Sequence, residues 1–394
     1  EETSGIIKFT FESDKYNEFV KYDYKINPKG FPIIYSFSGN NSNEYEFEIE
    51  KLLEGSLNGD FCIYPSIIDD ITKSVEGLLR QPYGCFEQVS SSTYPNILVL
   101  QILRENNSNN KELDSKALNF IKDGYNKLVA YETMANGFEW YGHLPPNEGL
   151  TAYGLFEFTE MKKVWNGVDE NMISRTKKWL LSRKKGDGNF KITQGKYGFS
   201  SAPQNVNNSY IVYSLAMAGI PFAEIEKEYN YAFEEALKSK DLYRMGLLAN
   251  ASYYFNKTDN LMKLVDEIGA IIDKNGFENI NAQTSITYSY GNLLKVEIVS
   301  LYLMALLKQT SKDVDRIQKC VDFIYKNKYN GYYCSTQGTI MALSALVEYS
   351  KFFKVTLEEV KFKITINNNE LYKSFLYFDK DRKSTRLNSS HRIR

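Results

Sequence analysis

The sequence predicts a mainly α-helical protein in which an α/α toroid of six helical hairpins is inserted into a small β-sandwich domain. Residues 1–62 and 355–381 alternate apolar and polar side chains, as half-buried strands do. Residues 63–354 follow helical periodicity instead. Within this block, apolar helices recur at intervals of roughly 40–60 residues, the length of a helical hairpin with its loops. A chain of 394 residues is long enough for such a ring and a flanking β domain.

The two ends of the chain carry the predicted strands. Near the N-terminus, "IIKFTF" (6–11), "YDYKI" (22–26) and "YEFEIE" (45–50) alternate with period two, and "NPKG" and "GNNSN" supply turn residues between them. Residues 355–378 return to alternation, with "NNN" as a hairpin turn. Because a helical block separates the two segments, we expect one β domain whose strands from both ends share a sheet.

Six helices of the block carry few charges and many Ala, Ser, Gly, Leu and Tyr residues, as expected of an inner ring with neighbours on all sides. Their apolar stretches begin near residues 94, 150, 208, 245, 296 and 337. The segments between them, for example 173–185, are amphipathic and suit an outer ring. An open superhelix of helix pairs is the competing arrangement.

Composition excludes several classes of protein. The formal net charge of -1, with charges of mixed sign along the chain, gives no indication of a nucleic-acid partner. Four cysteines without a CxxC pair and only two histidines argue against a metal centre, and no cofactor is predicted. No apolar run approaches the roughly 20 residues that span a bilayer. Since the chain begins without Met, we expect a piece of a longer protein whose signal region is absent. Residues 382–394 are basic, have no apolar face and are predicted to be a non-native tail.

The stretch "PYGCFEQ" (82–88) concentrates the candidate chemistry. A thiol at Cys85, three residues before Gln88 at a tight helix start, can attack the side-chain amide, expel ammonia and close an internal thioester. A helix N-terminus favours the thiolate that this reaction needs. Gly84 allows the preceding turn its backbone conformation. By spacing alone, however, CxEQ is a weak motif.

The surroundings of this stretch add further expectations. Tyr83 and Phe86 are placed to exclude water, which would hydrolyse an activated acyl group. Thr93 can cap a helix that has Pro95 in its first turn. We therefore expect the Cys85 and Gln88 side chains to meet at the start of one helix, near the mouth of the ring and facing the β domain.

Two other interpretations of the cysteine are open. Cys85 can be a buried small apolar residue, since free Cys is among the most buried residue types. It can also be a catalytic nucleophile with His143 as its base, although nothing papain-like surrounds it.

"PYGCFEQ" resembles the thioester signature of the alpha-2-macroglobulin and complement family, usually GCGEQ, and bacterial-type members are similar to this variant with Phe86 in place of Gly. The resemblance covers most of the chain. Residues 27–39 and 64–81 are similar to the family's β segment and its run-in to the thioester. Successive helices of the thioester domain resemble 147–161, 177–190, 291–307 and 334–350. In that family the domain is an α/α toroid inserted into a small β-sandwich, in agreement with the split pattern.

The resemblance implies roles for the motif. Cys85 supplies the sulfur and Gln88 the acyl carbon that ends on the target, while Gly84, Phe86 and Glu87 complete the signature without an assigned chemistry. Family members trap proteases: a bait segment is cut, the molecule rearranges, and the exposed thioester acylates the attacker. The chain is thus expected to be an endopeptidase inhibitor with a single-use thioester rather than an enzyme. No bait region or receptor domain is identifiable in it.

Partners and placement follow from the same resemblance. The expected partners are target proteases or cell-surface nucleophiles, bound covalently, and the remaining macroglobulin domains of the full-length protein. The expected location is extracellular, periplasmic or at the cell surface. Some members use a histidine to intercept the thioester, but the matching stretch here, 191–201, contains none. Direct reaction with amines is therefore expected, with His143 as a candidate auxiliary residue.

Two alternative functions share the architecture. An α/α-toroid enzyme, such as a glycosidase or a cyclase, needs paired carboxylates or an Asp-rich cluster in the central cavity, and "IDDI" (68–71) is the nearest match. A plain interaction scaffold would never form the thioester. The intact mass separates these classes, because a thioester lowers it by one ammonia.

Overall fold

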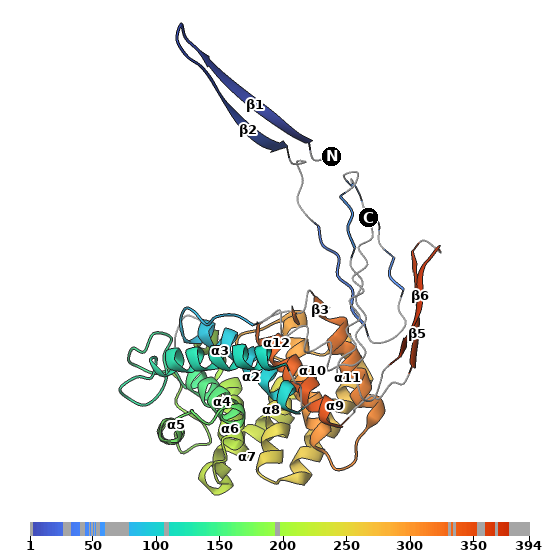
Figure 1. The fold of residues 1–394 in the computed structure, drawn as a ribbon. Helices are drawn as coiled ribbons and strands as arrows, with labels where there is room; N and C mark the ends of the chain where they lie inside the picture. The colour runs from blue at the N-terminus through green and yellow to red at the C-terminus, as the bar shows by residue number, and fades with distance from the viewer. Residues whose placement is uncertain are drawn as a thin grey trace.

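The computed structural model describes residues 3–26, short stretches between 33 and 59, and residues 79–105, 110–193, 198–329, 332–333, 336–352, 359–366 and 369–377. Helices fill most of the chain between residues 86 and 352, and a β-hairpin lies toward each end of the chain (Figure 1). The helices are α2 (Phe86–Glu105), α3 (Lys111–Val129), α4 (Glu148–Val164), α5 (Glu170–Ser182), α6 (Gln204–Met217), α7 (Phe222–Ser239), α8 (Leu242–Tyr254), α9 (Thr258–Asn275), α10 (Gly291–Lys308), α11 (Val314–Lys326) and α12 (Thr336–Phe352). The strands are β1 (Thr3–Glu12), β2 (Asn17–Ile26), β3 (Lys328–Tyr329), β4 (Tyr332–Tyr333), β5 (Glu359–Ile366) and β6 (Asn369–Tyr377).

The even-numbered helices form a closed inner ring. Helix α2 packs against α4, and the contacts continue through α6, α8, α10 and α12, which returns to α2. The helices α3, α5, α7, α9 and α11 pack outside, each on the inner helix that precedes it. The contact between α12 and α2 confirms the predicted α/α toroid and shows that the open superhelix is wrong. An outer helix for a sixth hairpin is not among the described residues.

The difference in sequence between inner and outer helices follows from burial. Every side chain of α10 from Val296 to Leu307 is buried, because α8, α9, α11 and α12 surround this helix. Helix α11 buries a stripe that includes Ile317, Cys320, Val321 and Ile324, with the helical spacing of one face. The segments expected to be inner helices are the even-numbered ones, as predicted.

Among the described residues, the β regions do not show the expected sheet shared by the two ends of the chain. Strand β1 pairs with β2, and β5 pairs with β6, so the described strands of the two ends do not share a sheet. Few residues separate the strands within each pair, so this pairing costs little chain entropy, whereas a sheet joining the two ends would need both positioned around the ring. The described residues of 45–50 are not in a strand either.

Several sequence predictions are not tested by these residues. The domain boundaries at 1–62, 63–354 and 355–381 stay predictions, since parts of each junction lie outside the described chain. The "IDDI" segment and the tail at 382–394 lie outside it as well.

Candidate functional site

The first turn of α2 begins directly after the cysteine of the motif. The carbonyl oxygen of Cys85 accepts a hydrogen bond from the backbone N–H of Val89 at 2.9 Å, so Cys85 holds the N-cap position and Phe86 is the first helical residue. The expected cap at Thr93 is wrong, because Thr93 and Pro95 both lie inside α2. The motif itself supplies the helix start.

Thr93 instead forms part of the helix packing. A Cβ on Gly124 of α3 would lie 2.1 Å from the Thr93 hydroxyl oxygen, so α2 and α3 approach closely at this point. The Asn96 side-chain amide donates to the Ser92 carbonyl oxygen at 2.9 Å, one turn back and beside the proline. Pro95 lies within the helix rather than at its start.

The spacing of Cys85 and Gln88 is that of a capping box. In a capping box the side chain of a Gln or Glu at the third helical residue bonds back to the backbone N–H of the N-cap residue. Here the Cys85 N–H donates to Gln88 Oε1 at 3.0 Å. Cysteine occupies the place that Ser or Thr usually takes, and the Gln88 amide is folded back onto the residue that carries the thiol.

Gly84 is required by the same contact. Its φ of +92° lies in the left-handed region, which favours glycine. A Cβ at this position would lie 2.0 Å from Gln88 Oε1 and 2.8 Å from Gln88 Cδ. Any other residue would therefore strain the turn and displace the Gln88 amide.

The turn before α2 is tied to the end of α3. The Tyr131 hydroxyl donates to the Gly84 carbonyl oxygen at 2.6 Å, and the Lys127 ammonium donates to the Pro82 carbonyl oxygen. Burial and the nearby charge of Cys85 raise the pKa of Tyr131, so its hydroxyl keeps its proton and remains a donor.

A second loop holds the first turn of α2 from the side. The Phe86 N–H donates to the Trp140 carbonyl oxygen at 3.0 Å, and the Trp140 indole N–H donates to Glu87 Oε2 at 3.1 Å. Glu87, for which the sequence suggested no chemistry, thus anchors this loop. A Cβ on Gly198 would lie 3.3 Å from Glu87 Oε2, so the histidine-free stretch 191–201 does reach the motif.

The two aromatic neighbours of Cys85 behave differently from each other. Phe86 is fully buried, and its ring centroid lies 5.2 Å from that of Phe138. The ring also occupies space next to Gly154, because a Cβ on Gly154 would lie 2.7 Å from Phe86 Cζ. Tyr83 is 68 % exposed. Cys85 itself is half-buried, so the expectation that these rings seal it from water is not met within the chain.

The side chains of the motif differ in their exposure to solvent. Gln88 is exposed, Cys85 is half-buried and forms no disulfide, and Glu87 is half-buried. The acyl carbon that a thioester would present is therefore on the more accessible side of the pair. The alternative in which Cys85 is a buried structural residue does not fit this exposure.

His143 lies in the loop that contacts α2, three residues after Trp140. Its backbone N–H donates to Glu139 Oε2 at 3.1 Å and its side chain is exposed. Among the described hydrogen bonds, none joins its imidazole to Cys85 or Gln88. The protease-like pairing of Cys85 with His143 has no support in this geometry.

Two carboxyl groups lie deep inside the ring. Glu157 of α4 is fully buried, and no hydrogen bond within the described part of the chain reaches either of its oxygens. Burial raises its pKa to about 8, and the nearby Ser90 hydroxyl lowers it by a smaller amount. Glu297 of α10 is also fully buried, and its Oε1 accepts from the Ser289 hydroxyl at 2.6 Å. Burial raises the pKa of Glu297 to about 7. Both groups favour the neutral acid in the folded protein.

Sequence reasoning missed Tyr131, Trp140 and Gly154. Tyr131 and Trp140 are 47 and 53 residues from their hydrogen-bond partners in the motif, and Gly154 lies within α4. The only signal in the sequence was the aromatic-rich composition of the loop before α4, which does not specify a contact.

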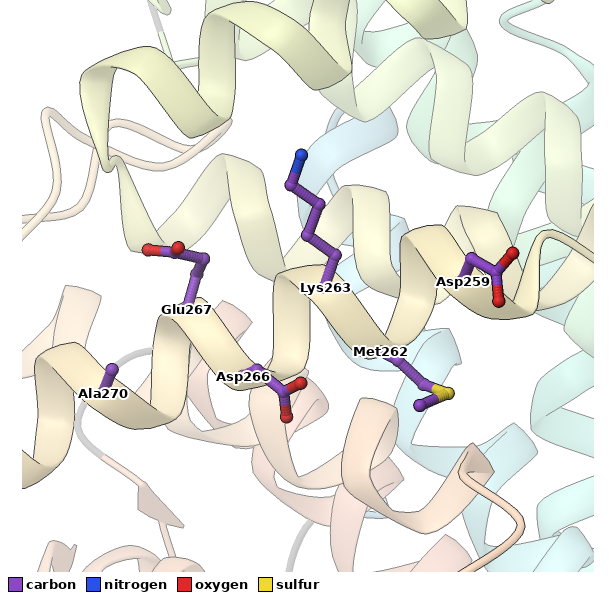
Figure 2. A pocket seen from close by; sticks show the side chains of 6 residues that line it. All are labelled: Asp259, Met262, Lys263, Asp266, Glu267 and Ala270. Atoms are coloured by element: carbon purple, nitrogen blue, oxygen red, sulfur yellow. The ribbon is translucent and has the colours of Figure 1, made fainter.

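A depression elsewhere on the described surface does not suggest a competing site. This depression is lined by side chains of α9 alone, so it does not enclose a ligand; they are Asp259, Met262, Lys263, Asp266, Glu267 and Ala270 (Figure 2). Within the described part of the chain, no group of three or more His, Cys, Asp or Glu side chains could hold a metal ion. None of the described helices is both long and apolar enough to cross a bilayer.

Comparison with known proteins gives consistent matches. Residues 61–349 match a family model described as the A-macroglobulin TED domain. Ovostatin from Gallus gallus is 26% identical over 322 residues, which is 76% of this chain and 22% of ovostatin. Thioester-containing protein 1 alleles S3 and S1 from Anopheles gambiae are 23% and 22% identical, covering 92% of this chain and 28% of each relative. The chain thus spans about a quarter of the length of these curated relatives.

Proposed function

Because this chain belongs to the A-macroglobulin family and carries its TED domain, we propose that it is the covalent element of a protease-trapping inhibitor. In this proposal Cys85 and Gln88 form an internal thioester that acylates amines of an attacking protease or of a target surface. The observation that supports it most is the 3.0 Å hydrogen bond from the Cys85 N–H to Gln88 Oε1, which brings the amide to the thiol-bearing residue.

Thioester formation is an acyl transfer within the first turn of α2. The Cys85 thiolate attacks Gln88 Cδ, and the electron pair of the carbonyl bond moves onto Oε1. When the intermediate collapses, the C–N bond breaks and Nε2 leaves as ammonia after gaining a proton. The N-cap position favours the thiolate, because unpaired N–H groups of the first helical turn stabilise negative charge.

The second transfer consumes the group. An amine of the target attacks the same carbon, the C–S bond breaks, and Cys85 is released as a thiol. Gln88 remains joined to the target through a new amide bond. The product does not regenerate the thioester, so the proposed role is that of a single-use inhibitor and not of an enzyme.

The alternative functions lack comparable support. A toroid glycosidase needs a pair of accessible carboxyl groups in its cavity, and Glu157 and Glu297 of the inner helices are fully buried, so a sugar does not reach them. A scaffold without chemistry would not need a cysteine at the N-cap position, which Ser or Thr usually takes.

Partners and location belong to the full-length protein. We propose that the remaining macroglobulin domains cover the exposed Gln88 until a protease triggers rearrangement, and that the whole protein acts outside the cell, in the periplasm or at the cell surface. Target proteases or surface nucleophiles are then joined covalently.

The test of this function is the intact mass of the purified protein. A thioester lowers the mass by one ammonia relative to the Cys85→Ser variant, after correction for the substitution, and methylamine treatment adds one methylamine and exposes one thiol. Equal corrected masses and no methylamine uptake would refute the thioester and favour the enzyme or scaffold alternatives.

A second experiment addresses the nucleophile. With no histidine in 191–201, we expect lysine amines to be captured in preference to hydroxyls. The protein is activated beside labelled methylamine and glycerol, and the measurement is repeated with His143→Ala. Efficient glycerol capture that disappears in the variant would contradict direct reaction and make His143 a catalyst.

A further inference from the structure

The peptide group between Gly84 and Cys85 is hydrogen-bonded at both ends. Its carbonyl oxygen accepts from the Tyr131 hydroxyl at 2.6 Å, and its N–H donates to Gln88 Oε1 at 3.0 Å. Hydrogen bonds at the two ends of one amide polarise each other, so each strengthens the other. The positive φ of Gly84 places this peptide in the required orientation.

Gln88 Oε1 is the atom on which charge develops. It becomes an oxyanion when the Cys85 thiolate attacks Gln88 Cδ, and again when a target amine attacks the thioester. A backbone N–H already aimed at such an oxygen stabilises the transition state without reorganisation. Its contribution depends on how rigidly the peptide that carries it is held.

We propose that Tyr131 is a positioning residue for both acyl-transfer steps, in which its hydroxyl holds and polarises the Gly84–Cys85 peptide so that the Cys85 N–H stabilises the oxyanion on Gln88 Oε1. This inference rests on the thioester function proposed above. In the first step the S–C bond forms and ammonia leaves with a proton from solvent. In the second step the new N–C bond forms, Cys85 leaves as thiolate, and the proton of the amine passes to solvent or to that sulfur.

The Tyr131 ring and the Tyr131 hydroxyl make different contacts, so the role of the hydroxyl can be tested alone. The ring packs edge-on against Phe86, with centroids 6.3 Å apart, so removing only the hydroxyl leaves this contact in place. Burial and the charge of Cys85 keep the hydroxyl protonated, as a donor must be.

The experiment uses Tyr131→Phe in the full-length protein, with Tyr141→Phe as the matched control. Tyr141 is 65 % exposed in the same region, and its hydroxyl makes none of the hydrogen bonds described for the motif. We expect Tyr131→Phe to slow both ammonia loss, followed by intact mass, and methylamine incorporation by about tenfold, as loss of support for one oxyanion donor predicts. Tyr141→Phe should stay within about twofold of wild type for both rates.

A spectroscopic measurement distinguishes this role from simple loosening of the turn. With ¹³C-labelled glutamine, the thioester carbonyl band in the infrared should move to higher frequency in Tyr131→Phe, because its hydrogen bond from Cys85 weakens. Lys127→Met, which removes the donor to the neighbouring Pro82 carbonyl, should lower the thermal unfolding temperature without shifting this band.

The outcomes separate the two proposals. Slower transfer and a shifted band in a folded Tyr131→Phe protein support the positioning role. Wild-type rates or an unshifted band in that variant would overturn it while leaving the thioester intact. A wild-type protein that neither loses ammonia nor takes up methylamine would overturn the proposed function itself.

Discussion

Gln88 and Glu157 are side chains of nearly the same shape in the same helical ring, and their environments are opposite. Gln88 lies exposed in the first turn of α2, and its oxygen accepts a backbone N–H from Cys85. Glu157 lies in the third turn of α4, fully buried, and its oxygens accept no hydrogen bond from any residue that the structure describes.

The difference comes from position along the helix. The first N–H groups of a helix have no partner within it, so they are available to a side chain that folds back. Further along, the backbone N–H groups are already bonded to carbonyl oxygens one turn earlier, and a buried carboxyl group must find side-chain partners or remain neutral. Reactive geometry is therefore available at the helix start, while the ring interior favours uncharged groups.

Gly84→Ala should displace the Gln88 amide from its position at the helix start. Its Cβ would lie 2.0 Å from Gln88 Oε1, so the amide must move by an ångström or more, and the positive φ adds strain. We expect thioester formation to slow by more than about 100-fold, as misplacement of reacting groups by 1 Å predicts. The measurement is ammonia loss by intact mass, with far-ultraviolet circular dichroism as the control for folding. Normal ammonia loss in the variant would mean that the close contact with Gly84 is not required.

Phe86→Ala tests whether the reactive turn depends on the apolar core beneath it. Phe86 is fully buried against Phe138 and the space above Gly154, so truncation leaves a cavity and should lower the free energy of unfolding by about 3–5 kcal/mol. Tyr83→Ala, at an exposed neighbour, should change it by less than about 0.5 kcal/mol. Urea unfolding of both variants gives these values. Similar losses in the two would show that Phe86 does not anchor the turn.

Glu157→Gln tests whether the buried carboxyl group of Glu157 is neutral in the folded protein. The pKa of Glu157 is about 8 in the folded protein against an ordinary 4.5. The folded state therefore keeps a proton that the unfolded chain loses, so this group's stabilisation is complete below about pH 4.5 and is lost as pH rises to about 8. Glutamine does not titrate. In the variant, the free energy of unfolding should therefore fall less between about pH 4.5 and pH 8 than in wild type, by roughly 2–4 kcal/mol.

Urea unfolding across this pH range measures the effect. Glu297→Gln is the comparison variant. It should change the pH dependence of the free energy of unfolding less than Glu157→Gln does, because the pKa of Glu297 is about 7. An identical pH dependence in wild type and Glu157→Gln would show that the buried carboxyl group is not neutral in the folded state.

Trp140→Phe gives the smallest expected effect and tests the loop that supports the helix start. The variant loses the indole N–H that donates to Glu87 at 3.1 Å, which is worth about 1 kcal/mol of stability. A double-mutant cycle with Glu87→Ala should show a coupling energy of about that size. Strict additivity of the two single variants would mean that this hydrogen bond does not stabilise the turn.

The sequence by itself determined which helices are inner and which are outer, and one contact of the site. Apolar composition on all sides marked the helices that became the inner ring, and amphipathic composition marked the outer ones, because burial on one side or on all sides leaves different patterns. The proximity of Cys85 and Gln88 was predictable too, since residues three apart in a helical turn are neighbours whatever the rest of the chain does.

Only the tertiary structure decided the rest. Closure of the ring depends on the contact between α12 and α2, which joins the two ends of the helical block and leaves no local signal. Tyr131 and Trp140 reach the motif from 47 and 53 residues away, and Gly154 receives the Phe86 ring only because α4 packs on α2. Thr93 had the composition of a helix cap but lies inside α2, because the motif's own capping-box geometry starts the helix earlier. Local spacing is read directly from sequence, whereas contacts between distant segments depend on which loops the ring brings together.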